Sequence, residues 1–166
     1  MIVHKGRTIF VGDTSVHEYP TSEQMAEIAI STARVVRLFG FEPKVAFVSH
    51  STFGQPLTSR TKHIRNAVEI LKENKVDFEF DGDMQPDVAL NPEYEELYPF
   101  SKIVGKANIL IMPGQHSAAI SYKLLKTIGD TKVIGPLLIG LGLPIEIAPL
   151  RSSTSEILNL ASIAAY

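Results

Sequence analysis

The residues from Asp77 to Pro92 read Asp-Phe-Glu-Phe-Asp-Gly-Asp-Met-Gln-Pro-Asp-Val-Ala-Leu-Asn-Pro. Phenylalanines alternate with a polar residue from Phe78 to Phe80, a pattern that predicts a short strand. This strand runs directly into a polar segment, Asp81 to Gln85, that contains one glycine and two aspartates. Open α/β sheets bind their ligands at the carboxyl ends of strands. The stretch therefore predicts a ligand-facing loop at the edge of a sheet.

Strand and helix patterns alternate along the rest of the chain. The predicted strands are Arg7–Val11, Lys44–Ser49, Asn108–Met112, Lys132–Ile139 and 144–147, the last two joined by a glycine-rich turn. The predicted helices are Ser22–Phe39, Ser59–Asn74, Ser117–Ile128 and Thr154–Ala165, with short helical segments opening near Pro86 and from Asn91 to Tyr98. Thr21 with Gln24 and Ser153 with Glu156 form capping boxes, which mark helix starts.

This alternation predicts an α/β fold, a three-layer α/β/α sandwich with helices on both faces of the sheet. The last two strand patterns resemble a hairpin more than a crossover, so we expect strands of mixed direction. A length of 166 residues suits one domain with a sizeable core. We find no internal repeat and no linker.

The composition narrows the classes of function. Apolar residues make up 45% and charged residues 20%, as in soluble globular proteins. The net charge of −2 argues against nucleic acid or an anionic membrane as partner. The absence of cysteine excludes disulfides, thiol catalysis and thiolate metal sites. No apolar run reaches the roughly 18 residues of a membrane span, and we expect a cytoplasmic protein.

Polar residues follow three of the predicted strands and form the candidate ligand site. They are Ser49, His50, Ser51 and Thr52 after one strand, Asp83 and Gln85 after the second, and Gly114 and Gln115 after the third. Hydroxyls, amides and backbone N–H groups at strand ends suit a phosphate or a phosphorylated cofactor. The alternative is that these residues only cap the following helices, because every α/β protein has such loops.

Two further kinds of site are less well supported. Asp81 and Asp83 could hold Mg²⁺ through their carboxylates, but a metal site needs a third ligand, so we predict no metal. His50 and His116 are single histidines in separate loops, and nothing marks either as a general base. The other histidines, His4, His17 and His63, are expected at the surface.

Five stretches, in order, resemble the second subdomain of phosphate acetyltransferases. They are 13–14 with Pro20–Ala29, Pro43–Gly54, Asp81–Leu90, Gly105–Pro113 and Ile134–Leu141. The resemblance runs from about residue 5 to the C-terminus. It implies the two-subdomain fold of that family, which is of the isocitrate/isopropylmalate dehydrogenase type. Residues 1–166 are then one domain, equivalent to the second subdomain and the C-terminal helix, and we expect the chain to be a piece of a longer protein.

The segment Leu97–Ser101 resembles one branch of the family, the acetyltransferase-like region fused to bacterial multidomain malic enzymes. In true acetyltransferases a serine, an arginine and an aspartate near the C-terminus serve catalysis. The matching positions here are Pro149, Leu150 and Glu156, so we assign no catalytic residue. Arg151 is displaced by one position and is retained as a ligand-binding candidate. Glu156 also has a structural role as the third helical residue of its capping box.

The resemblance implies a regulatory and oligomerisation region of a malic enzyme that responds to acetyl-CoA without transferring acetyl groups. The parent would oxidatively decarboxylate malate to pyruvate with NAD(P) and Mg²⁺ or Mn²⁺ held elsewhere, so no cofactor is expected in this chain. We expect a small-molecule CoA ester as ligand and a homodimer formed through the apolar region from Ile134 to Ile147. One alternative is a phosphate acetyltransferase represented only in part. The other is a structural dimerisation domain without a ligand.

Overall fold

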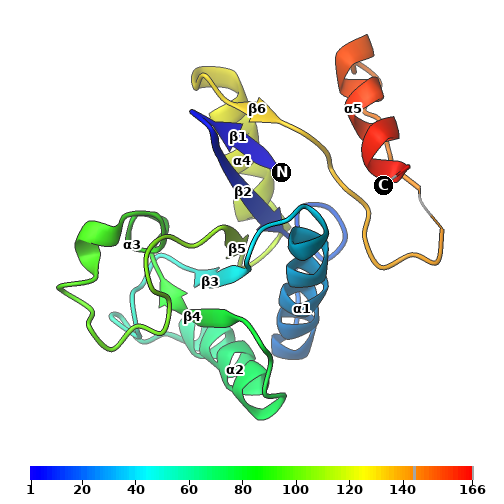
Figure 1. Cartoon of the computed structure of the whole chain (residues 1–166). Coiled ribbons are helices and arrows are strands. Elements are labelled where there is room, and N and C mark those ends of the chain that lie inside the picture. The colour runs from blue at the N-terminus through cyan, green and yellow to red at the C-terminus, as the bar shows by residue number, and fades with distance from the viewer. Residues whose placement is uncertain (144, 166) are drawn as a thin grey trace.

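The computed structural model describes residues 1–143 and 145–165, and these form a six-stranded mixed sheet in the order β4–β3–β5–β2–β1–β6 (Figure 1). The strands are β1 (Ile2–His4), β2 (Arg7–Gly12), β3 (Lys44–Val48), β4 (Glu79–Met84), β5 (Ile109–Ile111) and β6 (Lys132–Val133). Strands β2, β3, β4 and β5 are parallel to one another, whereas β1 is antiparallel to both β2 and β6. The predicted mixed sheet is confirmed.

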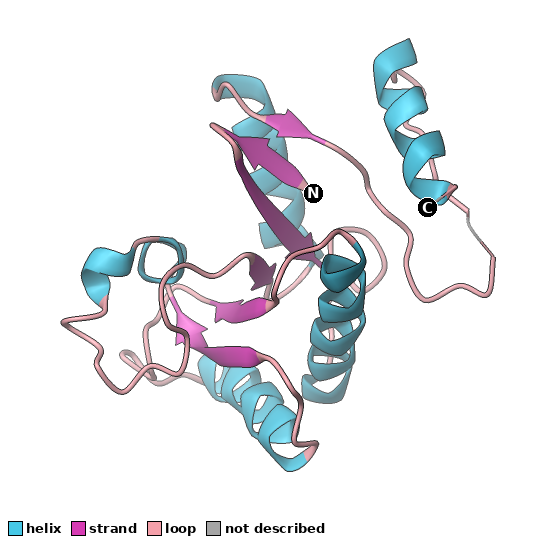
Figure 2. Ribbon diagram, in the orientation of Figure 1, coloured by secondary structure: helices cyan, strands magenta, loops and turns pink. Residues whose placement is uncertain are grey.

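Helices cover both faces of this sheet (Figures 1 and 2). One face carries α1 (Ser22–Leu38) and α2 (Ser59–Glu73), and the other carries α3 (Pro86–Leu90), the 3₁₀ turn η1 (Pro92–Tyr94) and α4 (Gln115–Ile128). The last helix, α5 (Thr154–Ala164), stands apart from the sheet at the end of the long segment that follows β6. The predicted three-layer α/β/α arrangement is confirmed.

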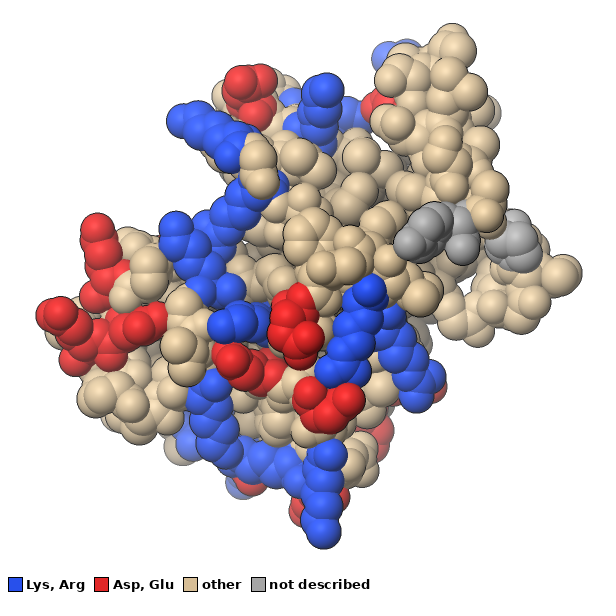
Figure 3. Space-filling view, viewed as in Figure 1, with Lys and Arg blue, Asp and Glu red and all other residues tan. Residues whose placement is uncertain are grey.

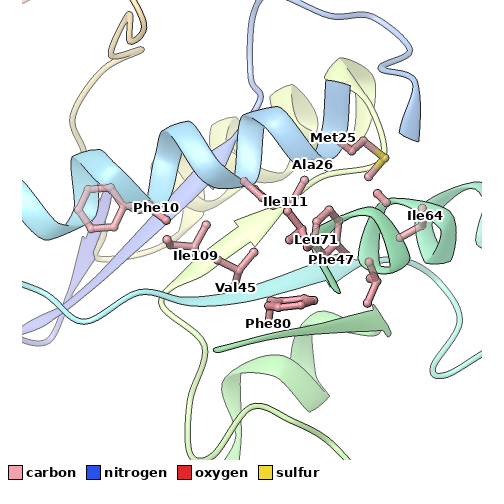
Figure 4. Packing of buried hydrophobic residues seen from close by; sticks show 14 of the residues in the cluster. Phe10, Met25, Ala26, Val45, Phe47, Ile64, Leu71, Phe80, Ile109 and Ile111 are labelled. Atoms are coloured by element: carbon pink, nitrogen blue, oxygen red, sulfur yellow. The ribbon is translucent and has the colours of Figure 1, made fainter. Parts of the chain in front are cut away.

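Strand β3 is buried on both faces, which explains its continuous apolar run. Val45 and Phe47 point into a core beneath α1 and α2, while Ala46 and Val48 point into the core on the opposite face. Figure 4 shows Phe47 between helix and strand residues of the first core. Burying one side chain of this size stabilises the fold by roughly 1.5–3 kcal/mol.

Both capping boxes that the sequence predicts are present at helix starts. Thr21 Oγ1 accepts the Gln24 N–H at 3.2 Å, and the Gln24 side chain accepts the Thr21 N–H at 2.8 Å. Ser153 and Glu156 make the same reciprocal pair at the start of α5. Each satisfies two backbone N–H groups that a helix start leaves without an intrahelical partner.

The prediction of a C-terminal hairpin is wrong. Among the described residues of the predicted hairpin, only Lys132 and Val133 form a strand, and β6 pairs with β1 rather than with the segment that follows it. Residue 144 lies outside the described residues, and 145–147 form no strand. The mixed direction of the sheet instead arises from β1, a three-residue strand too short to show a pattern in the sequence.

Two other boundaries differ from the expectation. β4 extends from Glu79 through Met84, so Asp81 to Met84 belong to a buried strand and not to a loop. The helix expected from Asn91 to Tyr98 is reduced to η1, with the Asn91 side chain accepting the Glu93 N–H at 3.1 Å. Among the described residues, no helix is both long enough and apolar enough to cross a bilayer.

Candidate functional site

The carboxyl ends of β3, β4 and β5 lie together at one edge of the sheet, because all three strands are parallel and β3 pairs with both of the others. The Ser49 N–H donates to the carbonyl oxygen of Met84 at 2.9 Å. The Gln85 N–H donates to Thr52 Oγ1 at 3.2 Å. The structure therefore brings together the loops in which the sequence placed its candidate ligand residues.

Asp83 holds the loop that follows β3. Its side chain is fully buried, and its Oδ1 accepts the Gly54 N–H at 3.0 Å. Its carbonyl oxygen accepts the Phe53 N–H at 2.6 Å. The second oxygen, Oδ2, and the buried hydroxyl of Ser51 have no hydrogen-bond partner within the described part of the chain. These contacts give Asp83 a structural role at this edge.

The polar residues of β4 are accommodated by backbone groups. Asp81 Oδ1 accepts the Gly82 N–H at 2.9 Å, and Oδ2 accepts the Lys102 N–H at 2.8 Å. A Cβ on Gly82 would lie 2.8 Å from both Cβ and the carbonyl oxygen of Phe47, so only glycine allows β3 to approach this closely. Within 1–143 and 145–165, no group of three acidic or histidine side chains could hold a metal ion.

Exposure separates the candidate ligand residues into two sets. Ser49, Ser51, Thr52, Asp83 and Gly114 are buried, whereas His50 and Gln85 are exposed and Gln115 is half-buried. The side chains that a ligand can reach at this edge are therefore those of the second set. The buried set shapes the loops that present them.

The loop after β5 packs against the segment that precedes α1. The Gln115 N–H donates to the carbonyl oxygen of Glu18 at 3.2 Å. A Cβ on Gly114 would lie 2.8 Å from that same oxygen, so a larger residue would push the two segments apart. This contact fixes Gln115 relative to the loop that follows β2.

An aromatic cluster that the sequence analysis missed lies beside the site. The ring of Phe53 is 5.5 Å from that of Tyr98 and 4.8 Å from that of Phe100. Phe53 comes from the loop that Asp83 holds, and the other two come from the segment between η1 and β5. Contacts between segments so distant in sequence leave no periodic pattern, so only the local concentration of aromatic residues could have indicated them.

Arg151 lies away from this edge. It lines a small cavity of about 120 Å³ together with Pro149, Glu156 and Lys126, between α4 and the start of α5. Pro149 and Leu150 are exposed, and Leu150 is fully so. The residues aligned with the family's catalytic positions thus sit with Arg151 near α5 rather than with His50 and Gln85.

The carboxylate of Glu156 makes an ion pair and hydrogen bonds that stabilise the start of α5. Its Oε1 pairs with Lys126 Nζ at 2.8 Å, and its Oε2 accepts the Ser153 N–H at 2.8 Å and the Ser153 hydroxyl at 3.0 Å. The Lys126 contact and these Ser153 bonds lower the pKa of Glu156 to about 2. A carboxylate held in its charged form in this way is a poor proton acceptor at neutral pH.

His17 is not simply a surface residue, as the sequence suggested. Its Nδ1 lies 2.8 Å from Asp13 Oδ2, and the imidazole is half-buried. Burial alone would raise the pKa of Asp13, but the N–H groups of Ser15, Val16 and His17 and the His17 ring together lower it. His63 is also half-buried, between Ser22 and the carbonyl oxygen of Pro20.

This arrangement defines an α/β protein in which polar loops lie together at the carboxyl ends of parallel strands, the edge at which open α/β sheets bind ligands. The family model described as phosphate acetyl/butaryl transferase matches residues 1–165. The chain belongs to that family.

Malic enzymes and phosphate acetyltransferases both have sequences similar to this chain. NADP-dependent malic enzyme from Rhizobium meliloti is 49% identical over 162 residues, which cover 98% of this chain and 21% of the relative. Phosphate acetyltransferase from Clostridium acetobutylicum is 37% identical over 157 residues, 93% of this chain and 47% of the relative. The chain thus spans about one fifth of the malic enzymes and about half of that acetyltransferase.

Solved structures show the same fold. The EutD phosphotransacetylase from Staphylococcus aureus superposes with a TM-score of 0.90 at 29% identity, over 99% of this chain and 51% of that chain. A phosphotransacetylase from Streptococcus pyogenes superposes with a TM-score of 0.87 at 35% identity, over 93% of this chain and 47% of that chain.

Proposed function

We propose that this chain is part of the C-terminal acetyltransferase-like region of a malic enzyme, and that this region binds acetyl-CoA as an allosteric effector without transferring acetyl groups. The observation that carries the proposal is the presence of Pro149 and Leu150 at the positions where the family resemblance expects a catalytic serine and arginine. Neither side chain can donate a hydrogen bond or neutralise a phosphate. By the family resemblance, acetyl transfer needs a hydrogen-bond donor and a cation at these two positions.

The surroundings of Glu156 support the same reading. This carboxylate aligns with the catalytic aspartate of true acetyltransferases, yet it is held by Lys126 and by the capping box with Ser153. Its structural contacts account for both of its oxygens. The 49% identity to a malic enzyme, against 37% to an acetyltransferase, favours the same branch.

A direct assay for acetyl transfer tests the absence of catalysis. Full-length protein is incubated with acetyl phosphate and CoA, with an active phosphate acetyltransferase as positive control, and acetyl-CoA is measured. We expect no formation above the rate without protein. Robust formation of acetyl-CoA would sink the regulatory proposal.

Calorimetry with acetyl-CoA on the full-length protein tests binding. We expect binding that weakens when His50→Ala or Gln85→Ala removes a reachable polar side chain, whereas Asp130→Asn at an exposed position far along the chain serves as the matched control. If acetyl-CoA produces neither heat nor a shift in melting temperature, the remaining reading is a structural dimerisation domain.

An allosteric effector must also bind two states of the protein with different affinity. The rate of malate decarboxylation by the full-length protein should therefore respond to acetyl-CoA, and the response should shrink in the His50→Ala variant. Binding without any change in that rate would remove the allosteric part of the proposal.

A phosphate acetyltransferase of which this chain is only a part is the second candidate. The observations that favour it are the family match over residues 1–165 and the TM-scores of 0.90 and 0.87 to phosphotransacetylases. The acetyl-transfer assay separates the two candidates, because only the second forms acetyl-CoA from acetyl phosphate.

A further inference from the structure

A cavity of about 460 Å³ lies between the end of β2, helix α1 and the segment that follows β6. We call it the α1 cavity and define it by Asp13, His17, Ile28, Ser31, Val35 and Leu137, which all line it. Ligand sites in proteins typically have volumes of roughly 300–1,000 Å³. None of the residues predicted to bind the CoA ester lines this cavity, so it is a different place from the edge of β3, β4 and β5.

The cavity has a largely apolar wall. Ile28 and Val35 of α1 line one side, and Ile134, Leu137 and Ile139 line the other. A wall of this kind holds the apolar body of a ligand, while a few polar groups fix its orientation.

The His17 imidazole supplies a hydrogen-bond acceptor to the cavity. Asp13 Oδ2 is 2.8 Å from His17 Nδ1, and because a carboxylate only accepts hydrogen bonds, Nδ1 carries the proton. In the neutral ring, Nε2 is then an acceptor. Nε2 has no partner among the residues that the structure describes.

The Asp13 carboxylate is itself already satisfied. Oδ1 accepts the N–H groups of Ser15 at 2.8 Å and Val16 at 3.0 Å, and Oδ2 accepts the His17 N–H at 2.8 Å. Asp13 therefore orients the imidazole, and the acceptor offered to a ligand is His17 Nε2.

The charges of the cavity disfavour an anion. No lysine or arginine occurs among its described lining residues, whereas Asp13 and Glu27 both line it. The nitrogen of Met1 also lines the cavity, and it is already paired because it donates to the carbonyl oxygen of Ile134 at 2.8 Å. A phosphate or carboxylate would find no cation to pair with.

We propose that the α1 cavity binds a small uncharged amphipathic molecule, whose apolar body packs between α1 and the segment after β6 and whose hydrogen-bond donor reaches His17. This site is independent of the acetyl-CoA proposal, since that ligand carries phosphates.

A pair of fluorescent probes tests this selectivity on the full-length protein. N-phenyl-1-naphthylamine is uncharged and carries one N–H donor, and 8-anilinonaphthalene-1-sulfonate has the same rings with an added sulfonate. We expect saturable binding of the uncharged probe, with the sulfonate bound at least about tenfold more weakly because it must enter a cavity without a cation.

Three variants locate the site. Ser31→Trp places an indole in the cavity and should abolish binding of the uncharged probe. His17→Phe keeps an aromatic ring but removes the acceptor, and should weaken binding by about fivefold, the value of one hydrogen bond. Leu57→Gln lies in the exposed loop before α2, outside the cavity, and should leave binding unchanged.

Circular dichroism shows whether Ser31→Trp is folded. If Ser31→Trp is misfolded, the result for His17→Phe still decides the test. Equal affinity for both probes, or a loss of binding in Leu57→Gln but not in His17→Phe, would overturn the proposal. So would displacement of the uncharged probe by acetyl-CoA with both cavity variants unaffected, because the probe would then occupy the CoA site.

Discussion

Asp83 places a carboxylate inside the sheet, which is energetically unfavourable in one respect and stabilises a loop in another. The cost is the desolvation of a group that water would otherwise solvate, and one of its oxygens has no partner among the described residues. The use is the hydrogen bond from the Gly54 N–H to Oδ1, which ties the loop after β3 to β4. The loop in turn carries Phe53 into the aromatic cluster.

Replacing this carboxylate should release the loop. We expect Asp83→Ala to lower the free energy of unfolding by about 1–3 kcal/mol, because the buried Gly54 N–H loses its acceptor. Urea denaturation measures the change. Asp130→Asn is the control, because Asp130 is exposed and its carboxylate makes no hydrogen bond or ion pair with the described residues. An unchanged midpoint for Asp83→Ala would mean that the loop does not depend on this bond.

Asp13 should make stability depend on pH on the acid side. Because its pKa is lowered in the folded protein, its contribution is fully present above the pKa of an unfolded aspartate, about 3.9, and is lost as the pH falls through the folded value. We expect the wild type to be more stable than Asp13→Asn at pH 6, and the difference to shrink below pH 4. A difference that stays constant from pH 6 to pH 3 would contradict this role.

At the scale of secondary structure, the elements that the sequence predicted well are those that carry their own signals. Helices α1 and α5 have capping boxes, and β3 has a continuous apolar run, so each could be placed without knowledge of its neighbours. The strands that were missed or wrongly bounded depend on partners. β1 is a strand because it pairs with β2 and β6, and β4 extends through two aspartates because Lys102 and Gly54 donate to them.

Helix α5 is held to the body by few contacts. Leu160 is its single buried residue among those described, and the pair of Lys126 with Glu156 joins it to α4. We expect Lys126→Met to increase amide hydrogen exchange in α5 while leaving β3 protected, with Lys62→Met on α2 as the control. If exchange in α5 is unchanged, the ion pair contributes nothing to docking, as many surface pairs do.

For the molecule as a whole, the distribution of apolar surface is uneven. In the view of Figure 3, charged side chains are spread over the left and lower parts of the molecule, whereas few cover α5 and the segment before it. Exposed large apolar residues include Ile120, Leu124, Leu125 and Ile128 on α4, Leu141, Leu143, Ile145 and Ile147 after β6, and Ile157 and Leu158 on α5. Exposed apolar surface on this scale indicates an interaction site.

We propose that this surface forms the homodimer. Leu143→Asp, at a leucine that is 70% exposed, should convert a dimer to a monomer in sedimentation velocity at micromolar concentration. Leu57→Asp is the matched control, since Leu57 is 67% exposed but lies in the loop before α2. A wild-type protein that sediments as a monomer would contradict the proposal.

The sequence predicted which loops form the candidate site but not which of their side chains are accessible to a ligand. Parallel strands bring the ends of β3, β4 and β5 together, which alternation along the chain already implied. Which side chains face a ligand depends on packing, and the structure buries Ser51 and Asp83 while exposing His50 and Gln85. The pair of Asp13 and His17 went unnoticed because a loop conformation, and not a periodic pattern, brings the two side chains together.

The pairing of β1 with β6 has a consequence for the order in which the chain folds. The Met1 amine and the carbonyl oxygen of Ile134 that extend this pairing are 133 residues apart, whereas Gly54 and Asp83 are separated by 29. By the logarithmic dependence of loop closure on length, joining the more distant pair costs roughly 1.3 kcal/mol more in chain entropy. The half of the sheet around β3 and β4 should therefore assemble first, and β6 should close the sheet last.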